Sequence, residues 1–259
     1  MPSVILAFIG ALSAHISVNS LNEYFDFRSG LDFKTKRTPF SGGSGTLPEN
    51  PNMASHALAT GVITFATTAL IGMYFLIVRG IFLLPLGLFG LLLVFFYTIW
   101  FVRNPLLCLI APGLGFGPLM VMGTAFVLTG AYSFTAFIVS LVPFFLVSDL
   151  LLLNQFPDVE ADRHVGRKHF PIVVGVRTSS LIYGAFLLLT YVSIILGVYL
   201  GSLPRFTLLG LSTTAIAVPA FVGAYRYGEN IEKLIPYMSL NVIIVLLTPV
   251  LVAAGLFIG

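Results

Sequence analysis

The sequence predicts an all-α membrane protein, a polytopic bundle of about eight transmembrane helices formed by a single integral-membrane domain over residues 1–259. Hydrophobic residues make up 58% of the chain and charged residues only 9%, whereas soluble domains contain about 25% charged residues. The apolar residues are also grouped into stretches of about 20 or more, the length of a helix that crosses the hydrocarbon core of a bilayer.

Eight apolar stretches are long enough to cross, or nearly cross, a bilayer. They lie near residues 3–26, 53–78, 80–102, 105–129, 132–156, 178–200, 206–226 and 234–258. Because consecutive connections alternate between the two sides of the membrane, eleven basic residues gather on one side and only Arg79 and Arg205 on the other. The eleven are Arg28, Lys34, Lys36, Arg37, Arg103, Arg163, Arg167, Lys168, Arg177, Arg226 and Lys233. The positive-inside rule then places the first side in the cytoplasm of a cell-membrane protein.

This orientation puts residue 1 on the outer side, because the first span runs from outside to inside. An even number of spans with both ends outside is uncommon. We therefore expect that one helix preceding residue 1 is missing, through a late start codon or true loss, and a genuine eight-span protein is the alternative. The net charge of +3 does not indicate a nucleic-acid partner, because the basic residues lie in loops between apolar spans and act as topology signals.

The first span carries a polar strip that ends in an acidic stretch. At about 100° per residue, His15, Asn19, Asn22 and Asp26 fall within one sector of about 60°, with Glu23 beside it. Polar groups at membrane depth are costly unless they face partners or a cavity, so this strip is expected to line a pocket. A glycine at residue 30 then permits the chain to leave the helix, and an aspartate follows at residue 32.

Residues 29–52 form the one long polar loop near the start of the chain. Lys34, Lys36 and Arg37 can hold phosphate oxygens, and the glycines of Ser41–Gly45 let backbone amides approach an anion. The alternative is a flexible linker whose basic residues only determine topology.

The fifth span ends in the densest acidic stretch, residues 154–163. Asn154, Asp158 and Asp162 recur every four residues, so they lie on one helical face if the helix continues through Pro157. Asp149 points away from that face and is expected to make a polar contact with a neighbouring helix.

Other spans contain isolated features. The stretch Gly113–Pro118 interrupts an apolar run and predicts an irregular or kinked segment near a cavity. It is no dinucleotide fingerprint, because no strand precedes it. Asn241 is expected to form an interhelical hydrogen bond, and the single Cys108 is expected to pack in an apolar span.

The two acidic stretches together contain six of the ten carboxylates in the chain, and we expect them to face each other across one membrane-embedded pocket. Clustered carboxylates and amide oxygens bind hard divalent cations, and Mg²⁺ suits a site that substrate phosphates complete. Cations are needed as well, because acids alone repel a diphosphate. The candidates are Arg28, Lys36, Arg37, Arg163, Arg167 and Lys168. The four histidines are scattered and unpaired with cysteine, which argues against a soft-metal site.

A diphosphate at the membrane surface beside an aromatic, apolar cavity indicates a lipid diphosphate substrate. The plausible chemistry is metal-assisted departure of pyrophosphate, which leaves an allylic carbocation. Metal and basic side chains stabilise the charge of the leaving group, and aromatic faces such as those of Tyr24 and Phe25 can stabilise the cation.

The two acidic stretches resemble the two signatures of the UbiA superfamily of intramembrane aromatic prenyltransferases. The first reads Asn22-Glu23-x-x-Asp26, with Glu23 where the family usually has Asp, and Asp32 lies two residues later than in the common pattern. The second reads Asp158-Val-Glu-Ala-Asp162. The wider spacing of the first signature and the stretch 113–124 are similar to the branch that makes menaquinone precursors.

The resemblance implies a fold of nine spans and transfer of a polyprenyl group from its diphosphate to an aromatic acceptor with Mg²⁺, the acceptor of the menaquinone branch being 1,4-dihydroxy-2-naphthoate. We expect catalytic roles for Asp26, Asp158 and Asp162. Metal ligands are expected among Asn22, Glu23, Asp26, Asp32, Asp158 and Asp162. Substrate contacts are expected from Asn22, Tyr24, Arg28, Lys36, Arg37, Asn154, Arg163, Arg167 and Lys168.

Two alternatives stay open. The same enzyme class can use another acceptor, such as 4-hydroxybenzoate or geranylgeranylglyceryl phosphate, although a phosphorylated acceptor needs a further basic cluster. A transporter or cation channel would use intramembrane acids along an ion path. Against transport, the acids gather on one side of the membrane and no internal repeat is evident.

Overall fold

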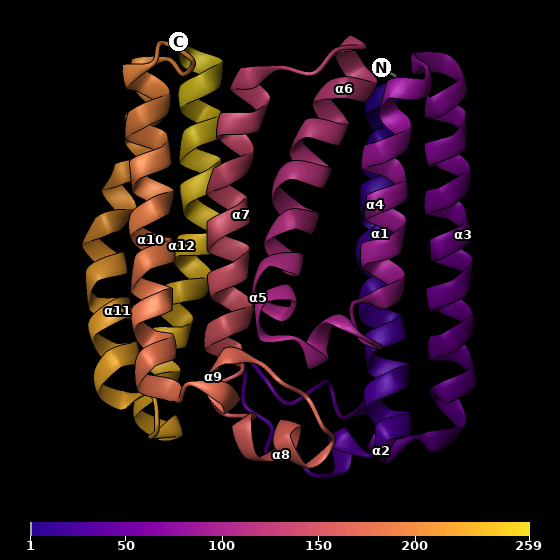
Figure 1. The fold of residues 1–259 in the computed structure, drawn as a ribbon, viewed down its shortest axis with the longest axis vertical. Helices are drawn as coiled ribbons and strands as arrows, with labels where there is room; N and C mark the ends of the chain where they lie inside the picture. Colours follow the sequence, from indigo (N-terminus) through magenta and orange to yellow (C-terminus); the bar gives the residue numbers. More distant parts are fainter. Residues whose placement is uncertain (1) are drawn as a thin grey trace.

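The computed structural model describes residues 2–259, and in this part of the chain all regular structure is helical. Eight helical segments are long and apolar enough to cross a membrane, which confirms the predicted fold class. They comprise Pro2–Ser29, Pro51–Arg79, Ile81–Ile99, Pro105–Thr129, Phe134–Asn154, Val176–Tyr199, Arg205–Tyr227 and Ile231–Ile258. Figure 1 shows them side by side and upright, with short helices gathered at the lower end.

The spans are built from eleven main elements. They are α1 (Pro2–Ser29), α3 (Ala54–Arg79), α4 (Leu84–Phe96), α5 (Pro105–Leu114), a π-helix η5 (Gly115–Met122), α6 (Gly123–Thr129), α7 (Phe134–Asn154), α10 (Val176–Tyr199), a 3₁₀ helix η6 (Arg205–Thr213), α11 (Thr214–Tyr227) and α12 (Ile231–Ile258). The short elements at the lower end include η1 (Leu31–Phe33), α2 (Thr46–Glu49), η4 (Phe101–Arg103), α8 (Val159–His164) and α9 (Phe170–Val173).

The bundle has two hydrophobic cores. The larger one lies among α7, α10, α11 and α12 and includes Leu146, Tyr183 and Ile194, each with 0% of its surface exposed. The smaller one joins α3 to α6 through Phe75 and Phe126. In Figure 1 the helices α10, α11 and α12 stand at the left, α1, α3 and α4 at the right, and α5 to α7 between them.

The predicted irregular segment in the fourth span is confirmed as the π-helix η5. Prolines at 112 and 118 remove backbone donors from the regular ladder, which favours such a bulge. Glycines let this segment approach α7 closely: a Cβ on Gly113 would lie 2.2 Å from the Phe144 carbonyl oxygen, and one on Gly117 would lie 2.5 Å from that of Ser140. On its other side the ring of Phe116 contacts the ring of His15 on α1, with centroids 5.4 Å apart.

Asn154, Asp158 and Asp162 do not share one continuous helical face, because the condition for it, a helix that continues through Pro157, is not met. Helix α7 ends at Asn154, residues 155–158 form a turn, and α8 begins at Val159. Pro157 causes the break, because it has no N–H and its ring would clash with the carbonyl four residues earlier. The second acidic stretch therefore turns away from the axis of α7 and crosses the lower end of the bundle (Figure 1).

The two predicted interhelical contacts differ in outcome. The Tyr183 hydroxyl on α10 donates a hydrogen bond of 3.0 Å to Asn241 Oδ1 on α12, as predicted. Asp149 is fully buried on α7, but neither of its carboxylate oxygens has a hydrogen-bond partner among residues 2–259, so its predicted polar contact is wrong.

Arg79, one of the two basic residues at the upper end, closes the end of α6. Its Nε donates to the Val127 carbonyl at 2.6 Å and its Nη2 to the Leu128 carbonyl at 3.0 Å. The last carbonyls of a helix have no partner within that helix, so a cation there supplies both hydrogen bonds and a favourable interaction with the helix dipole.

We expect Arg79→Ala to lower the free energy of unfolding by about 1–3 kcal/mol, because it leaves two carbonyls without a charged donor. Thermal denaturation of the purified protein in detergent measures the change. Arg205→Ala, which removes an exposed arginine from the same end, is the matched control, and an equal loss in both variants would contradict the capping role.

Candidate functional site

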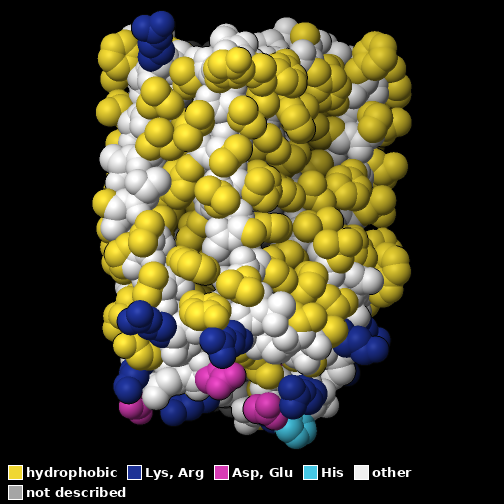
Figure 2. Space-filling model, turned by 60° about the vertical axis from the view of Figure 1, so that its left-hand side comes forward, with side chains coloured by type: hydrophobic (Ala, Val, Ile, Leu, Met, Phe, Trp, Pro, Cys, Tyr) yellow, Lys and Arg dark blue, Asp and Glu magenta, His cyan; other side chains and the backbone are white. Residues whose placement is uncertain are grey.

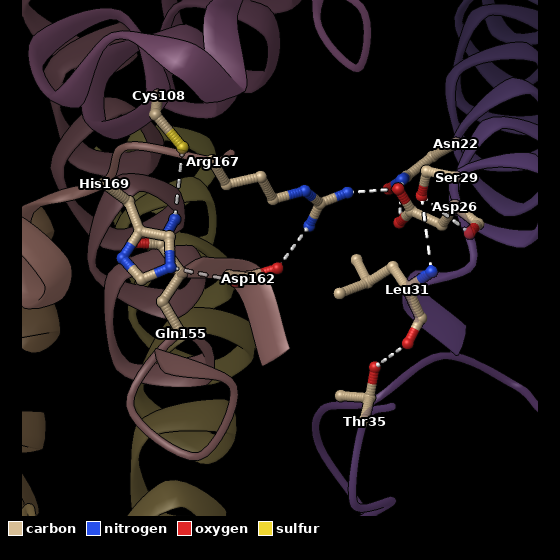
Figure 3. A network of polar contacts seen from close by, with 10 residues as sticks. All are labelled: Asn22, Asp26, Ser29, Leu31, Thr35, Cys108, Gln155, Asp162, Arg167 and His169. Atoms are coloured by element: carbon tan, nitrogen blue, oxygen red, sulfur yellow. Dashed lines mark hydrogen bonds and ion pairs between the residues drawn. The ribbon is translucent and has the colours of Figure 1, made fainter. Parts of the chain in front are cut away.

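The two acidic stretches meet at the lower end of the bundle, as predicted (Figures 1 and 3). Arg167 joins them: its Nη2 forms an ion pair with Asp26 Oδ1 in the last turns of α1, and its Nη1 lies 3.1 Å from Asp162 Oδ1 on α8. The contact with Asp26 joins residues that are 141 apart in the sequence. The Arg167 side chain is 18% exposed, so this bridge is largely removed from water.

Helix periodicity orders the first half of the site. Asn22 and Asp26 are one turn apart on α1, and Asn22 Nδ2 donates to Asp26 Oδ2 at 2.6 Å. Both oxygens of Asp26 thus have a donor. Gly30, with φ of 78°, then ends the helix in the left-handed conformation, as the sequence predicted, and Asp32 follows in η1.

A histidine completes the second half of the site. His169 Nε2 donates to Asp162 Oδ2 at 2.9 Å, and both side chains are buried, with 2% of each residue exposed. Because Arg167 binds the other oxygen, Asp162 is held from two sides. This role of His169 was not predicted from the sequence, in which the four histidines are scattered.

The loop after α8 explains how His169 reaches Asp162. The amides of Val165 and Arg167 both donate to the Asp162 carbonyl, at 3.2 and 3.1 Å, and Gly166 turns with φ of 79°. The Lys168 amide then donates to the Val102 carbonyl in η4 at 2.9 Å. Seven residues separate the partners along the chain, a spacing that no helical or strand pattern marks as a contact.

Within the two acidic stretches, Asp32 and Asp158 each have one buried carboxylate oxygen without a hydrogen-bond partner among residues 2–259. These oxygens are Asp32 Oδ2 and Asp158 Oδ1. Burial raises the pKa of Asp32 to about 7, and the nearby charges of Asp26 and Glu23 add to the effect. Burial likewise raises the pKa of Asp158 to about 7, with a further contribution from the charge of Asp162. A cation bound to either carboxylate would lower the pKa of that carboxylate again, because an adjacent positive charge favours the ionised form.

The glycine-rich loop reaches the acidic site, but it contacts carboxylates. Ser41 and the Gly42 amide oppose the rise in the pKa of Asp158, and a Cβ on Gly43 would lie 3.1 Å from Asp32 Oδ1. The Ser44 hydroxyl donates to Glu23 Oε1 at 2.5 Å. This loop therefore covers the acids of both stretches.

Several predicted site residues take no part in the contacts that join Asp26, Asp162 and Arg167. Arg37 binds Glu49 at 2.6 Å and donates to the Gly45 carbonyl at 3.2 Å, so it secures the loop. Arg163 pairs with Glu160 at 3.2 Å on the surface. The structure shows no contact between an acidic residue of the site and the side chains of the exposed Arg28, Lys36 and Lys168, or those of the half-buried Tyr24 and Asn154.

A divalent cation such as Mg²⁺ needs several oxygen donors close together, and the site meets this need only in part. In residues 2–259 no three His, Cys, Asp or Glu side chains lie close enough together to hold a metal ion. Arg167 stands between Asp26 and Asp162 and supplies the positive charge that joins them. The unpartnered oxygens of Asp32 and Asp158 nevertheless fit a hard cation, because each is a buried anionic donor without hydrogen bonds.

The sequence model of the UbiA prenyltransferase family matches residues 1–257. The chain is also similar to the 1,4-dihydroxy-2-naphthoate octaprenyltransferase of Bacillus subtilis (strain 168), with 24% identity over 186 residues. The matched stretch covers 70% of this chain and 57% of the relative's length.

Proposed function

Because the chain belongs to the UbiA prenyltransferase family, we propose that it transfers a polyprenyl group from polyprenyl diphosphate to an aromatic acceptor, with Mg²⁺. The acceptor we propose is 1,4-dihydroxy-2-naphthoate or a related quinone precursor, as in the name of the B. subtilis relative. The observation that carries the proposal is the Arg167 bridge between Asp26 and Asp162, which unites both acidic stretches in one site at the end of the bundle.

Asp32 and Asp158 would hold the magnesium ion through their unpartnered oxygens, together with Asn22, Glu23, Asp26 and Asp162. When bound, the ion supplies positive charge for the diphosphate that leaves. His169 keeps Asp162 in one orientation, so that this carboxylate is preorganised for its ligand.

Arg167 would bind diphosphate oxygens in the substrate complex. A guanidinium donates bidentate hydrogen bonds to phosphate as readily as to carboxylate. Its present partners, Asp26 and Asp162, are themselves proposed metal ligands, so a cation held by these carboxylates would compete with Arg167 for them and leave its guanidinium available to phosphate. One side chain thereby couples metal binding to substrate binding.

Prenyl transfer by the purified protein tests the proposal. The assay contains Mg²⁺, a labelled polyprenyl diphosphate and a panel of acceptors that includes dihydroxynaphthoate, 4-hydroxybenzoate and geranylgeranylglyceryl phosphate. We expect a prenylated naphthoate product that disappears when EDTA is added and returns with excess Mg²⁺. Product with a different acceptor would keep the reaction and refute the acceptor, and failure to cleave the diphosphate with any acceptor would refute the function.

We also propose that the site faces the cytoplasm across the cell membrane, on the basis of the distribution of basic residues. The single cysteine, Cys108, is buried with 3% exposed, so the natural chain is close to a cysteine-free background for labelling. Asn50 and Ala131 are exposed in loops at opposite ends of the bundle.

We expect a membrane-impermeant maleimide to label Asn50→Cys in inside-out vesicles but not in intact cells or right-side-out vesicles. Ala131→Cys should show the reverse pattern, because its loop lies at the other end of the bundle. The readout is the mass shift of the purified variant. Labelling of Asn50→Cys from outside would invert the proposed orientation.

A further inference from the structure

A second polar pocket lies at the lower end of the bundle, where α10 begins and the chain turns from α11 into α12. Its volume is about 370 Å³, and it is lined by Val176, Arg177, Tyr225, Arg226, Gly228 and Glu229. None of these residues belongs to either acidic stretch. In Figure 1, α10 and α11 stand at the left edge, whereas α1, which carries the first acidic stretch, stands on the right.

Two arginines give the pocket its charge, and an aromatic ring holds one of them. Arg177 Nε donates to the Tyr225 hydroxyl at 3.1 Å, and the Arg177 Cζ lies 5.0 Å from the centroid of the Tyr225 ring. Among residues 2–259, neither Arg177 nor Arg226 forms an ion pair with a carboxylate. Glu229 is the one acidic residue of the lining, so positive charge predominates.

Apolar side chains extend from the pocket along the same two helices. On α10, Leu181 and Leu188 follow Arg177 by one and three turns and are 52% and 63% exposed. On α11, Val218 and Val222 precede Tyr225 on its own face and are 63% and 38% exposed. Figure 2 shows this side of the molecule: apolar side chains cover most of it, and Lys and Arg gather along the lower edge.

We propose that this pocket binds the phosphate group of an anionic membrane lipid, with the acyl chains along the exposed faces of α10 and α11. A phosphate diester carries one negative charge and two non-bridging oxygens, which can accept the paired hydrogen bonds that a guanidinium donates. The pocket lies where the apolar surface ends, which is the depth of lipid headgroups. A free phosphate would match the arginines equally well, but it would leave the apolar faces unused.

The test measures lipid binding to the detergent-purified full chain by native mass spectrometry, with phosphatidylglycerol and phosphatidylcholine as probes. We expect preferential retention of phosphatidylglycerol. The double variant Arg177→Gln/Arg226→Gln should bind it about tenfold more weakly, because both charge-assisted contacts to the phosphate are lost. Arg103→Gln, which removes an exposed arginine of the same end outside the pocket, should bind as the natural protein does.

A second pair of variants tests whether the lipid binds this pocket specifically or is attracted only by the overall positive charge at the lower end of the bundle. Tyr225→Leu keeps every charge but removes the ring and hydroxyl that hold Arg177, so it should also weaken phosphatidylglycerol binding, whereas Tyr225→Phe keeps the ring and should weaken it less. These single variants carry the test if the double variant does not fold. Three outcomes would overturn the proposal: unchanged binding in the double and Tyr225→Leu variants, an equal loss in Arg103→Gln, or displacement of the lipid by millimolar inorganic phosphate.

Discussion

Asp158→Asn is expected to reduce prenyl transfer by about 100- to 1,000-fold, the range observed when one preorganised electrostatic contact to a transition state is removed. The substitution keeps the size of the side chain and removes a buried charge whose Oδ1 has no hydrogen-bond partner in residues 2–259. If that oxygen serves a cation, the amide oxygen of asparagine is a weaker substitute, because it carries no negative charge. The measurement is kcat/KM for the polyprenyl diphosphate, with gel filtration and a melting curve to show that the variant folds.

Glu160→Gln is the matched control for this prediction. Glu160 lies between Asp158 and Asp162 in the sequence, but its side chain is 75% exposed and pairs with Arg163 on the surface. Surface ion pairs contribute about 0–1 kcal/mol, so activity and stability should both stay near those of the natural protein. An equal loss of activity in Glu160→Gln would show that the acids act through the charge of the whole stretch and would contradict the site described above.

His169→Phe is expected to raise the Mg²⁺ concentration needed for half-maximal activity by about 10- to 100-fold, the usual cost of losing a residue that orients a metal ligand. Phenylalanine fills the buried space left by the imidazole but cannot donate to Asp162 Oδ2. The carboxylate then keeps one of its two restraints, Arg167. The measurement is a Mg²⁺ titration of the initial rate.

His169→Gln distinguishes orientation from packing. Its amide can donate from a position near that of Nε2, so it should recover part of the lost Mg²⁺ affinity, which a packing role alone would not produce. His164→Gln removes a nearby exposed histidine whose Nδ1 contacts the Glu160 carbonyl, and it should leave the titration unchanged. A normal Mg²⁺ response in His169→Phe would refute the positioning role.

The sequence alone was enough to predict the membrane spans and the half of the site that α1 contributes. Apolar stretches of membrane length predict helices because unpaired backbone groups cannot be exposed to lipid. Helical periodicity placed Asn22 and Asp26 on one face, and the structure joins them by a hydrogen bond. Periodicity did not determine the geometry at Asp158 and Asp162, because a shared face required the helix to continue through Pro157 and the helix ends before this proline.

Charge and spacing alone determined that this is a helical membrane protein with two acidic stretches at one end, because both properties follow from local patterns along the chain. Only the tertiary structure decided which partner each charged group takes. Arg167 bridges the stretches, Arg37 secures a loop, and Arg163 stays at the surface. His169 joins Asp162 because a turn at Gly166 reverses the chain and burial leaves a carboxylate in need of a donor. Such pairings depend on the path of the loops and on the exclusion of water. No periodic pattern in the sequence encodes either of them.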